Sequence, residues 1–369
     1  LNMMALGFGT WEVGLLSSAT LLGSALATLA VGAWGQHFHH RHLLLAAALL
    51  MAVTGLSFAG LSAFWPLLLV AFVGTLNPSS GDVSVFLPLE HARLADAAQG
   101  DARTTLFARY SLTGALCAAV GSLAAAVPEA LAGQGIDQLV ALRGMFVLYG
   151  GVGLAVWLLY RRLPEPLPHE RPRATAPLGV SRPIVFRLAA LFSVDAFAGG
   201  LVVNSLLALW LFQRFDLSLA AAGSFFFWAG LLSALSQLAA PHVARRIGLI
   251  NTMVFTHIPS SVCLILAAFA PTLPLALGLL LVRSALSQMD VPTRSAFVMA
   301  VVTPPERAAA SFTAVPRSLA AAVSPTLGGA LVAAGWLAAP LVACGALKIA
   351  YDVALFIAFR RHRSQEQHE

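Results

Sequence analysis

Eleven long apolar runs, separated by charged residues or by clusters of glycine and proline, fill most of this 369-residue chain. A helix needs about 20 apolar residues to cross the hydrocarbon core of a bilayer, so each run is long enough to span a membrane. The composition agrees, because 59% of the residues are hydrophobic and only 10% are charged. The sequence therefore predicts an all-α, polytopic membrane protein with spans at 10–34, 43–63, 64–88, 104–127, 138–160, 183–212, 217–243, 249–270, 272–291, 308–334 and 337–359.

The basic residues indicate the orientation of the chain. When alternate loops are assigned to one side, 17 of the 22 Lys and Arg residues fall on that side and only Arg143 and Arg214 on the other. Cytoplasmic loops carry the excess of basic residues, so we expect a cytoplasmic C-terminus and Leu1 outside. Lys348 is the only lysine, a bias that indicates a GC-rich bacterial genome and hence the bacterial inner membrane.

The longest polar interruption, residues 161–182, holds five prolines among Arg, Glu and His, which is typical of a solvated linker. It divides the chain into an N-terminal bundle, 1–160, and a C-terminal bundle, 183–369. Because the chain starts outside without a signal sequence, we expect one further helix upstream of Leu1. The sequence would then contain 11 of 12 helices, and the upstream DNA should encode about 20 more apolar residues in frame.

The two halves carry a weak internal repeat. A shift of 208 residues aligns proline 66 with 274, serine 79 with 287, aspartate 82 with 290, valine 83 with 291 and arginine 109 with 317. The aligned positions include the polar interruptions of two otherwise apolar spans. Two related halves around a site near the midplane are a common architecture of transporters.

Three short segments resemble motifs of the major facilitator superfamily of secondary transporters. GAWGQHFHHR at 32–41 and PHVARRIG at 241–248 are similar to its glycine-rich basic loops, although Gln36 and Arg245 stand where an Asp is expected. SPTLGG at 324–329 is similar to a Gly-Pro-rich segment common in its helix 11. The resemblance implies two helical bundles around a central cavity, with the span at 10–34 as helix 2 of twelve.

One apolar span carries a stripe of polar side chains. Its members, Arg283, Ser287, Asp290 and Arg294, recur at steps of four, three and four residues, which keeps them on one helix face. The repeat places Thr75, Ser79 and Asp82 at the corresponding positions of the other half. The resemblance implies that both helices line the cavity, whereas the alternative is that small polar residues serve helix packing.

Asp195 and Arg283 are the charges predicted to lie near mid-membrane, at depths of roughly 12 Å and 17 Å from the rise per residue. An arginine offers a fork of donors to an anion, and a buried carboxylate can carry a proton. We therefore expect a substrate and proton pathway of Asp195, Arg283, Asn204, Thr75, Ser79 and Ser287, in which Asn204 takes part only if Gly199 and Gly200 bend the helix. The alternative is a permanent Asp195–Arg283 bridge.

Two other charged sets have structural interpretations. Lys348 and Asp352 are four residues apart, so we expect them to neutralise each other on one helix face. For the cytoplasmic gate we predict crosswise pairs, Asp82 with Arg317 and Asp290 with Arg109, formed when the protein is open to the outside. Pairing within each half is the competing arrangement.

Nothing in the sequence resembles a nucleotide loop or a nucleophile with its base, so neither an ATP-driven pump nor an enzyme is predicted. Four loop histidines, at 37, 39, 40 and 42, lack carboxylate or cysteine companions, which favours a basic lipid-facing loop over a metal site. We expect no cofactor, no metal and no nucleic acid.

The predicted function is a monomeric exporter of a small molecule that is coupled to protons or to another ion. Two alternatives stay open: an organic-anion importer or uniporter, and a non-transporting sensor or scaffold.

Overall fold

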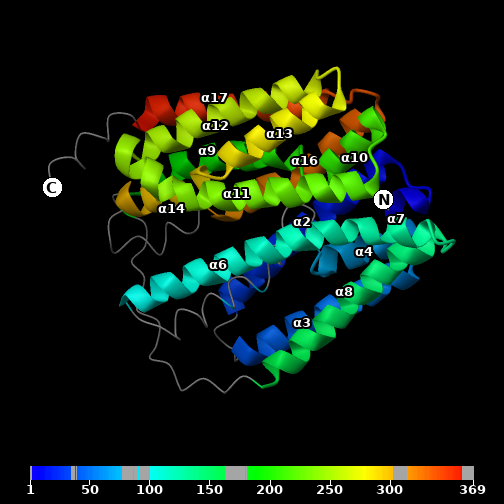
Figure 1. Ribbon diagram of the computed structural model, residues 1–369. Coiled ribbons are helices and arrows are strands. Elements are labelled where there is room, and N and C mark those ends of the chain that lie inside the picture. Colours follow the sequence, from blue (N-terminus) through cyan, green and yellow to red (C-terminus); the bar gives the residue numbers. More distant parts are fainter. Residues whose placement is uncertain are drawn as a thin grey trace.

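The computed structural model describes residues 2–34, 38, 40–76, 86, 90, 100–162, 179, 181–301 and 314–359, and this part of the chain is helical without strands (Figure 1). The helices are α1 (Asn2–Ala5), α2 (Thr10–Trp34), α3 (His40–Gly60), α4 (Phe64–Val73), α6 (Gly100–Leu123), α7 (Val127–Ala132), α8 (Gln138–Tyr160), α9 (Arg182–Gly200), α10 (Asn204–Phe215), α11 (Leu219–Ile247), α12 (Leu249–Ala268), α13 (Leu273–Ser287), α14 (Asp290–Val301), α16 (Ala314–Ala333) and α17 (Ala339–Phe359).

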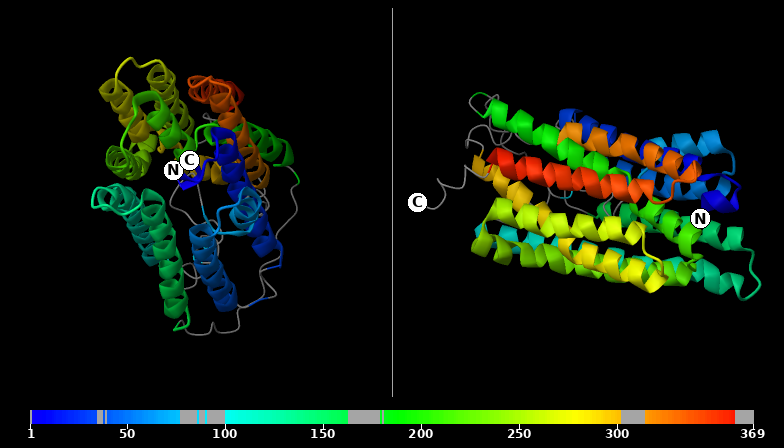
Figure 2. Two further views of the ribbon diagram at one scale, coloured as in Figure 1. Left: turned by 90° about the vertical axis from the view of Figure 1, so that its right-hand side faces the viewer. Right: turned by 90° about the horizontal axis from the view of Figure 1, so that it is seen from above.

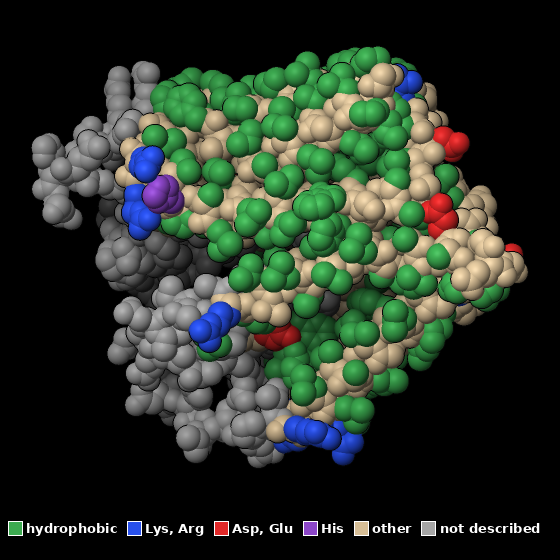
Figure 3. Space-filling view, viewed as in Figure 1, with side chains coloured by type: hydrophobic (Ala, Val, Ile, Leu, Met, Phe, Trp, Pro, Cys, Tyr) green, Lys and Arg blue, Asp and Glu red, His purple; other side chains and the backbone are tan. Residues whose placement is uncertain are grey.

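The helices form a multi-pass membrane protein. Within the described residues, nine helical stretches are long and apolar enough to cross a bilayer, and the shorter α4 and the 20-residue α16 occupy two further predicted spans. Apolar side chains cover most of the described surface visible in Figure 3. Among the large ones, Trp65 is 73% exposed and Phe269 66%. Such a surface suits lipid rather than water. The predicted all-α membrane fold is confirmed.

Two predicted spans are each built from two helices. The span predicted at 183–212 consists of α9 and α10, which are separated at Leu201–Val203, and the span predicted at 272–291 is interrupted at Gln288 and Met289 and continues as α14 to Val301. Pro292 explains the second break, because a proline lacks the N–H group and its ring clashes with the carbonyl four residues earlier, at Gln288. The span predicted at 64–88 also differs, since its helix ends at Val73 before an extended Gly74.

The ends of α2 define the two sides of the molecule, here called the Thr10 side and the Trp34 side. The N-terminal and C-terminal halves meet near the Thr10 side, where Gly14 of α2 lies so close to α16 that an added Cβ would be 2.6 Å from the Pro325 carbonyl oxygen. In the same contact, the Thr326 hydroxyl donates to Ser18 Oγ at 2.7 Å. Helices α6 and α11 also pack together and diverge toward the Trp34 side (Figures 1 and 2).

The C-terminal half has a polar layer between two apolar clusters. The cluster nearer the Thr10 side includes Ala198, Leu264 and Leu280, and the cluster nearer the Trp34 side includes Phe192 and Phe297. The layer takes residues from the middle of α9, α12 and α17 and from the junction of α13 and α14. Apolar packing on both sides therefore fixes the helices that carry the polar side chains.

Candidate functional site

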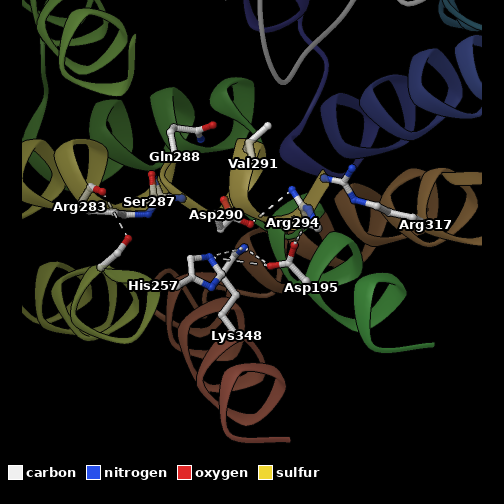
Figure 4. Close-up of a pocket in the computed structure, with 11 residues that line it drawn as sticks. Asp195, His257, Arg283, Ser287, Gln288, Asp290, Val291, Arg294, Arg317 and Lys348 are labelled. Carbon is white, nitrogen blue, oxygen red and sulfur yellow. Dashed lines mark hydrogen bonds and ion pairs between the residues drawn. The ribbon is translucent and has the colours of Figure 1, made fainter. Parts of the chain in front are cut away.

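A cavity of about 140 Å³ of water-accessible space lies in the polar layer (Figure 4). Six helices of the C-terminal half, and the turn between α13 and α14, supply its lining. The lining residues are Asp195, His257, Ser260, Arg283, Ser287, Gln288, Asp290, Val291, Arg294, Arg317 and Lys348. Four of them are permanent cations and two are carboxylates, so the cavity wall has an excess of positive charge.

Asp195 of α9 anchors two of the cations. Its Oδ1 accepts a hydrogen bond from Lys348 Nζ at 2.6 Å, and its Oδ2 accepts one from Arg294 Nη1 at 3.1 Å. Arg294 reaches Asp290 on its own helix at 3.3 Å with its other terminal nitrogen and lies over the ring of Phe192. Asp195 is only 4% exposed, so these charges are mutually stabilised in a low-dielectric setting.

His257 of α12 joins this network to a third carboxylate. Its Nδ1 lies 3.0 Å from Asp352 Oδ2, and its Nε2 lies 3.3 Å from Lys348 Nζ and 3.9 Å from Asp195 Oδ1. His257 is 3% exposed and Asp352 is 1% exposed. Among the described residues, the imidazole therefore links Asp352 to the Lys348–Asp195 pair.

Arg283 and Arg317 lie toward opposite ends of the labelled group (Figure 4). Among the residues that the structure describes, neither guanidinium forms an ion pair with a carboxylate. The backbone carbonyl of Arg283 accepts a hydrogen bond from Ser260 Oγ at 3.3 Å, which fixes its helix but leaves its side chain free to bind another group. Arg317 Nε is buried and has no hydrogen-bond partner within the described part of the chain. These two groups can hold an anion.

The cavity brings together the predicted stripe of α13 and α14. Arg283, Ser287, Asp290 and Arg294 all line it, and Asp195 faces them. The alternative of an Asp195–Arg283 bridge is wrong, because the partners of Asp195 are Lys348 and Arg294.

Two other predicted pathway residues lie outside the cavity. Asn204 is exposed at the start of α10, even though the helix is broken where Gly199 and Gly200 lead into Leu201. Thr75 is buried in the N-terminal half, where its hydroxyl lies 2.9 Å from the hydroxyl of Tyr149. Ser79 is outside the described residues.

The predicted gate pairs are not formed by the residues described. Asp290 pairs with Arg294 instead of Arg109, which is exposed on α6. Arg317 lines the cavity, and its predicted partner Asp82 is outside the described residues. This conformation therefore contains neither the crosswise Asp290–Arg109 pair nor, in the described part, the competing Asp290–Arg317 pair.

The predicted neutralisation of Lys348 by Asp352 is wrong. Lys348 pairs with Asp195 of α9, and Asp352 binds His257 of α12. Spacing along one helix could not reveal this, because partners on neighbouring helices compete for the same side chains. His257 was not among the predicted site residues, although an ionisable side chain inside an apolar span is a signal of function.

Comparisons with known proteins agree with this architecture. The sequence profile of the Major Facilitator Superfamily matches residues 3–315. An uncharacterised membrane protein of Saccharomyces cerevisiae is 24% identical over 387 residues, covering 94% of this chain and 86% of that protein. The solved structure of a D-xylose-proton symporter has a TM-score of 0.72 at 15% identity, covering 96% of this chain and 88% of that one. The human organic anion transporter MFSD10 gives a TM-score of 0.62 at 20% identity, covering 93% and 83% respectively.

Proposed function

The chain belongs to the major facilitator superfamily of membrane transporters, and we propose that it is a secondary transporter that carries a small organic anion by alternating access. The observation that carries this proposal is the pair of guanidinium groups, Arg283 and Arg317, that line the cavity without a carboxylate partner among the described residues. A charged side chain inside a membrane protein is costly unless water or an opposite charge compensates it. An anionic substrate supplies that compensation.

The structure supports an anion over the uncharged or cationic cargo that a general exporter can carry. Both carboxylates of the lining are already engaged, Asp195 by Lys348 and Arg294, and Asp290 by Arg294. A cationic substrate would have to displace one of these cations, whereas an anion needs no displacement.

The orientation follows from the basic side chains, and we propose that the Trp34 side faces the cytoplasm of a bacterial inner membrane. The Lys and Arg side chains visible in Figure 3 lie mainly at that side, as the loops predict. The two halves touch near the Thr10 side, which would then be the outer side. The structure would correspond to an inward-facing monomer that exchanges its anion with the cytoplasm.

The test is uptake into liposomes that contain the purified protein. The probes are three labelled anions, each with a neutral counterpart: benzenesulfonate with benzenesulfonamide, succinate with succinamide, and gluconate with sorbitol. We expect at least one anion to be carried at ten or more times the rate of its counterpart. Equal rates within each pair would contradict the anion proposal, and no flux of any probe would favour the non-transporting scaffold.

Variants connect the flux to the cavity. Arg283→Gln and Arg317→Gln should each reduce uptake of the carried anion at least tenfold, and Arg283→Lys should weaken binding because the charge stays but the fork is lost. Arg214→Gln is the matched control, since Arg214 is exposed at the end of α10 and lies over Phe215, away from the cavity. Unchanged uptake in both cavity variants would remove the two arginines from the site.

A further inference from the structure

Two neighbours of His257 define the hydrogen-bonding pattern of its ring. Lys348 Nζ can only donate, so His257 Nε2, at 3.3 Å, must be the acceptor of that hydrogen bond. Nδ1 lies 3.0 Å and 3.1 Å from the two oxygens of Asp352 and is therefore the nitrogen that carries the hydrogen. The lone pair of Nε2 is therefore directed at the lysine that Asp195 also binds.

The charges around the imidazole leave room for one proton. Asp195 comes from α9, Asp290 and Arg294 from α14, and Lys348 and Asp352 from α17. These five groups contain three carboxylates and two cations, so they carry one negative charge in excess. A proton on His257 balances it. Arg283 of α13 and Arg317 of α16, the remaining charged groups at the cavity, bring the whole set, with His257 neutral, to one positive charge, which a bound anion compensates. The Tyr351 ring packs against the imidazole at a near-perpendicular angle.

We infer that His257 carries the coupling proton and that its protonation transfers Lys348 from Asp195 to the substrate, an inference that rests on the proposed transport of an anion. A proton taken up from the cavity binds Nε2, which can then no longer accept from Lys348. The new N–H group faces Asp195 Oδ1, now 3.9 Å away, and replaces the ammonium there.

Lys348 is placed to make this move. Its side chain is 12% exposed, more than that of Asp195 at 6% or His257 at 4%, and it lines the cavity. Released from Asp195, it adds a third free cation to Arg283 and Arg317 and strengthens the binding of an anion. Proton and anion therefore bind together, and the proton leaves Nε2 when the anion departs and Lys348 returns to Asp195. The transporter is a proton–anion symporter.

The experiment uses the full-length protein in liposomes that enclose a pH-sensitive dye. The substrate is the anion carried in the six-probe assay, with benzenesulfonate preferred because it cannot itself carry a proton through lipid. Wild-type uptake should acidify the lumen. His257→Gln should exchange labelled for unlabelled anion at no less than half the wild-type rate. In the same variant, lumen acidification and accumulation driven by a proton gradient should each fall at least tenfold. His242→Gln, at an exposed histidine of α11, should retain all three activities.

The outcomes separate the two proposals. Gradient-driven accumulation that persists in His257→Gln would overturn the inference and leave anion transport standing, whereas no anion flux in the wild type would overturn the proposed function. If His257→Gln fails to insert, Asp352→Asn keeps the imidazole and removes the charge that stabilises its protonated form. The pH of half-maximal uptake should then fall by about one unit or more, and an unshifted profile would overturn the inference.

Discussion

Asp195→Asn should destabilise the C-terminal half, because it removes the carboxylate shared by two buried cations. Breaking a buried ion pair by deleting one partner costs about 3–5 kcal/mol. Asn can still accept one hydrogen bond, so we expect the lower end of this range, about 3 kcal/mol. Arg294 keeps Asp290 at 3.3 Å, whereas Lys348 keeps no carboxylate within ion-pairing distance among the described residues. Most of the loss should therefore come from Lys348.

Double variants test that assignment. Asp195→Asn with Lys348→Met removes the uncompensated cation and should recover at least half of the lost stability. Asp195→Asn with Arg294→Met should recover none, because it also leaves Asp290 without its partner. The free energy of unfolding is measured by titrating mixed micelles with SDS and following tryptophan fluorescence. Asp216→Asn is the control, since this exposed residue has φ 52°, which Asn tolerates well.

Two results would refute the reasoning. An unfolding free energy of Asp195→Asn within about 0.5 kcal/mol of the wild type would show that Asp195 is not the anchor of the two cations. Rescue by Arg294→Met equal to that by Lys348→Met would show that the loss is shared and that Lys348 is not the cation that depends on Asp195 alone, as the symport cycle requires.

Two further predictions concern the contacts between the halves. Gly14→Leu should separate α2 from α16, because an added Cβ would already lie 3.0 Å from Gly329 Cα. Spin labels on the two helices should report a longer distance, and anion flux should fall at least fivefold. An unchanged distance would contradict the close packing of the two helices. For the proposed gate, cysteines introduced at positions 82 and 317 should cross-link when the protein is open to the outside and cysteines at 82 and 109 should not, whereas a cross-link between 82 and 109 would support pairing within the half.

The sequence predicts the membrane fold well because the bilayer imposes a simple length rule. Apolar runs of about 20 residues and the placement of arginines are local properties, and the family profile over 3–315 confirms the membership that three short segments suggested. The stripe from Arg283 to Arg294 was also predictable from local sequence, because helical periodicity decides which side chains share a face.

The partners of buried charges were not predictable by that logic. Lys348 and Asp352 satisfy the spacing rule for a helix pair, yet each binds a residue more than 90 positions away in the chain. In a packed bundle the nearest opposite charge is set by which helix lies alongside, and α12 and α9 both flank α17. His257 gave no pattern because a single residue has no periodicity, and its role depends entirely on those neighbours.

The break between α13 and α14 connects the charge arrangement to movement. It leaves Arg283 on α13 and the Asp290–Arg294 pair on α14. The distance between Arg283 and that pair is therefore not fixed by one continuous ladder of backbone hydrogen bonds. Arg294 is fixed to α9 through Asp195, whereas Arg283 forms no ion pair in the described part of the chain. A rotation at Gln288 and Met289 would therefore move Arg283 relative to a stationary Arg294. An anion that contacts both helices would favour one position of the break, which is how a substrate can bias a two-state carrier.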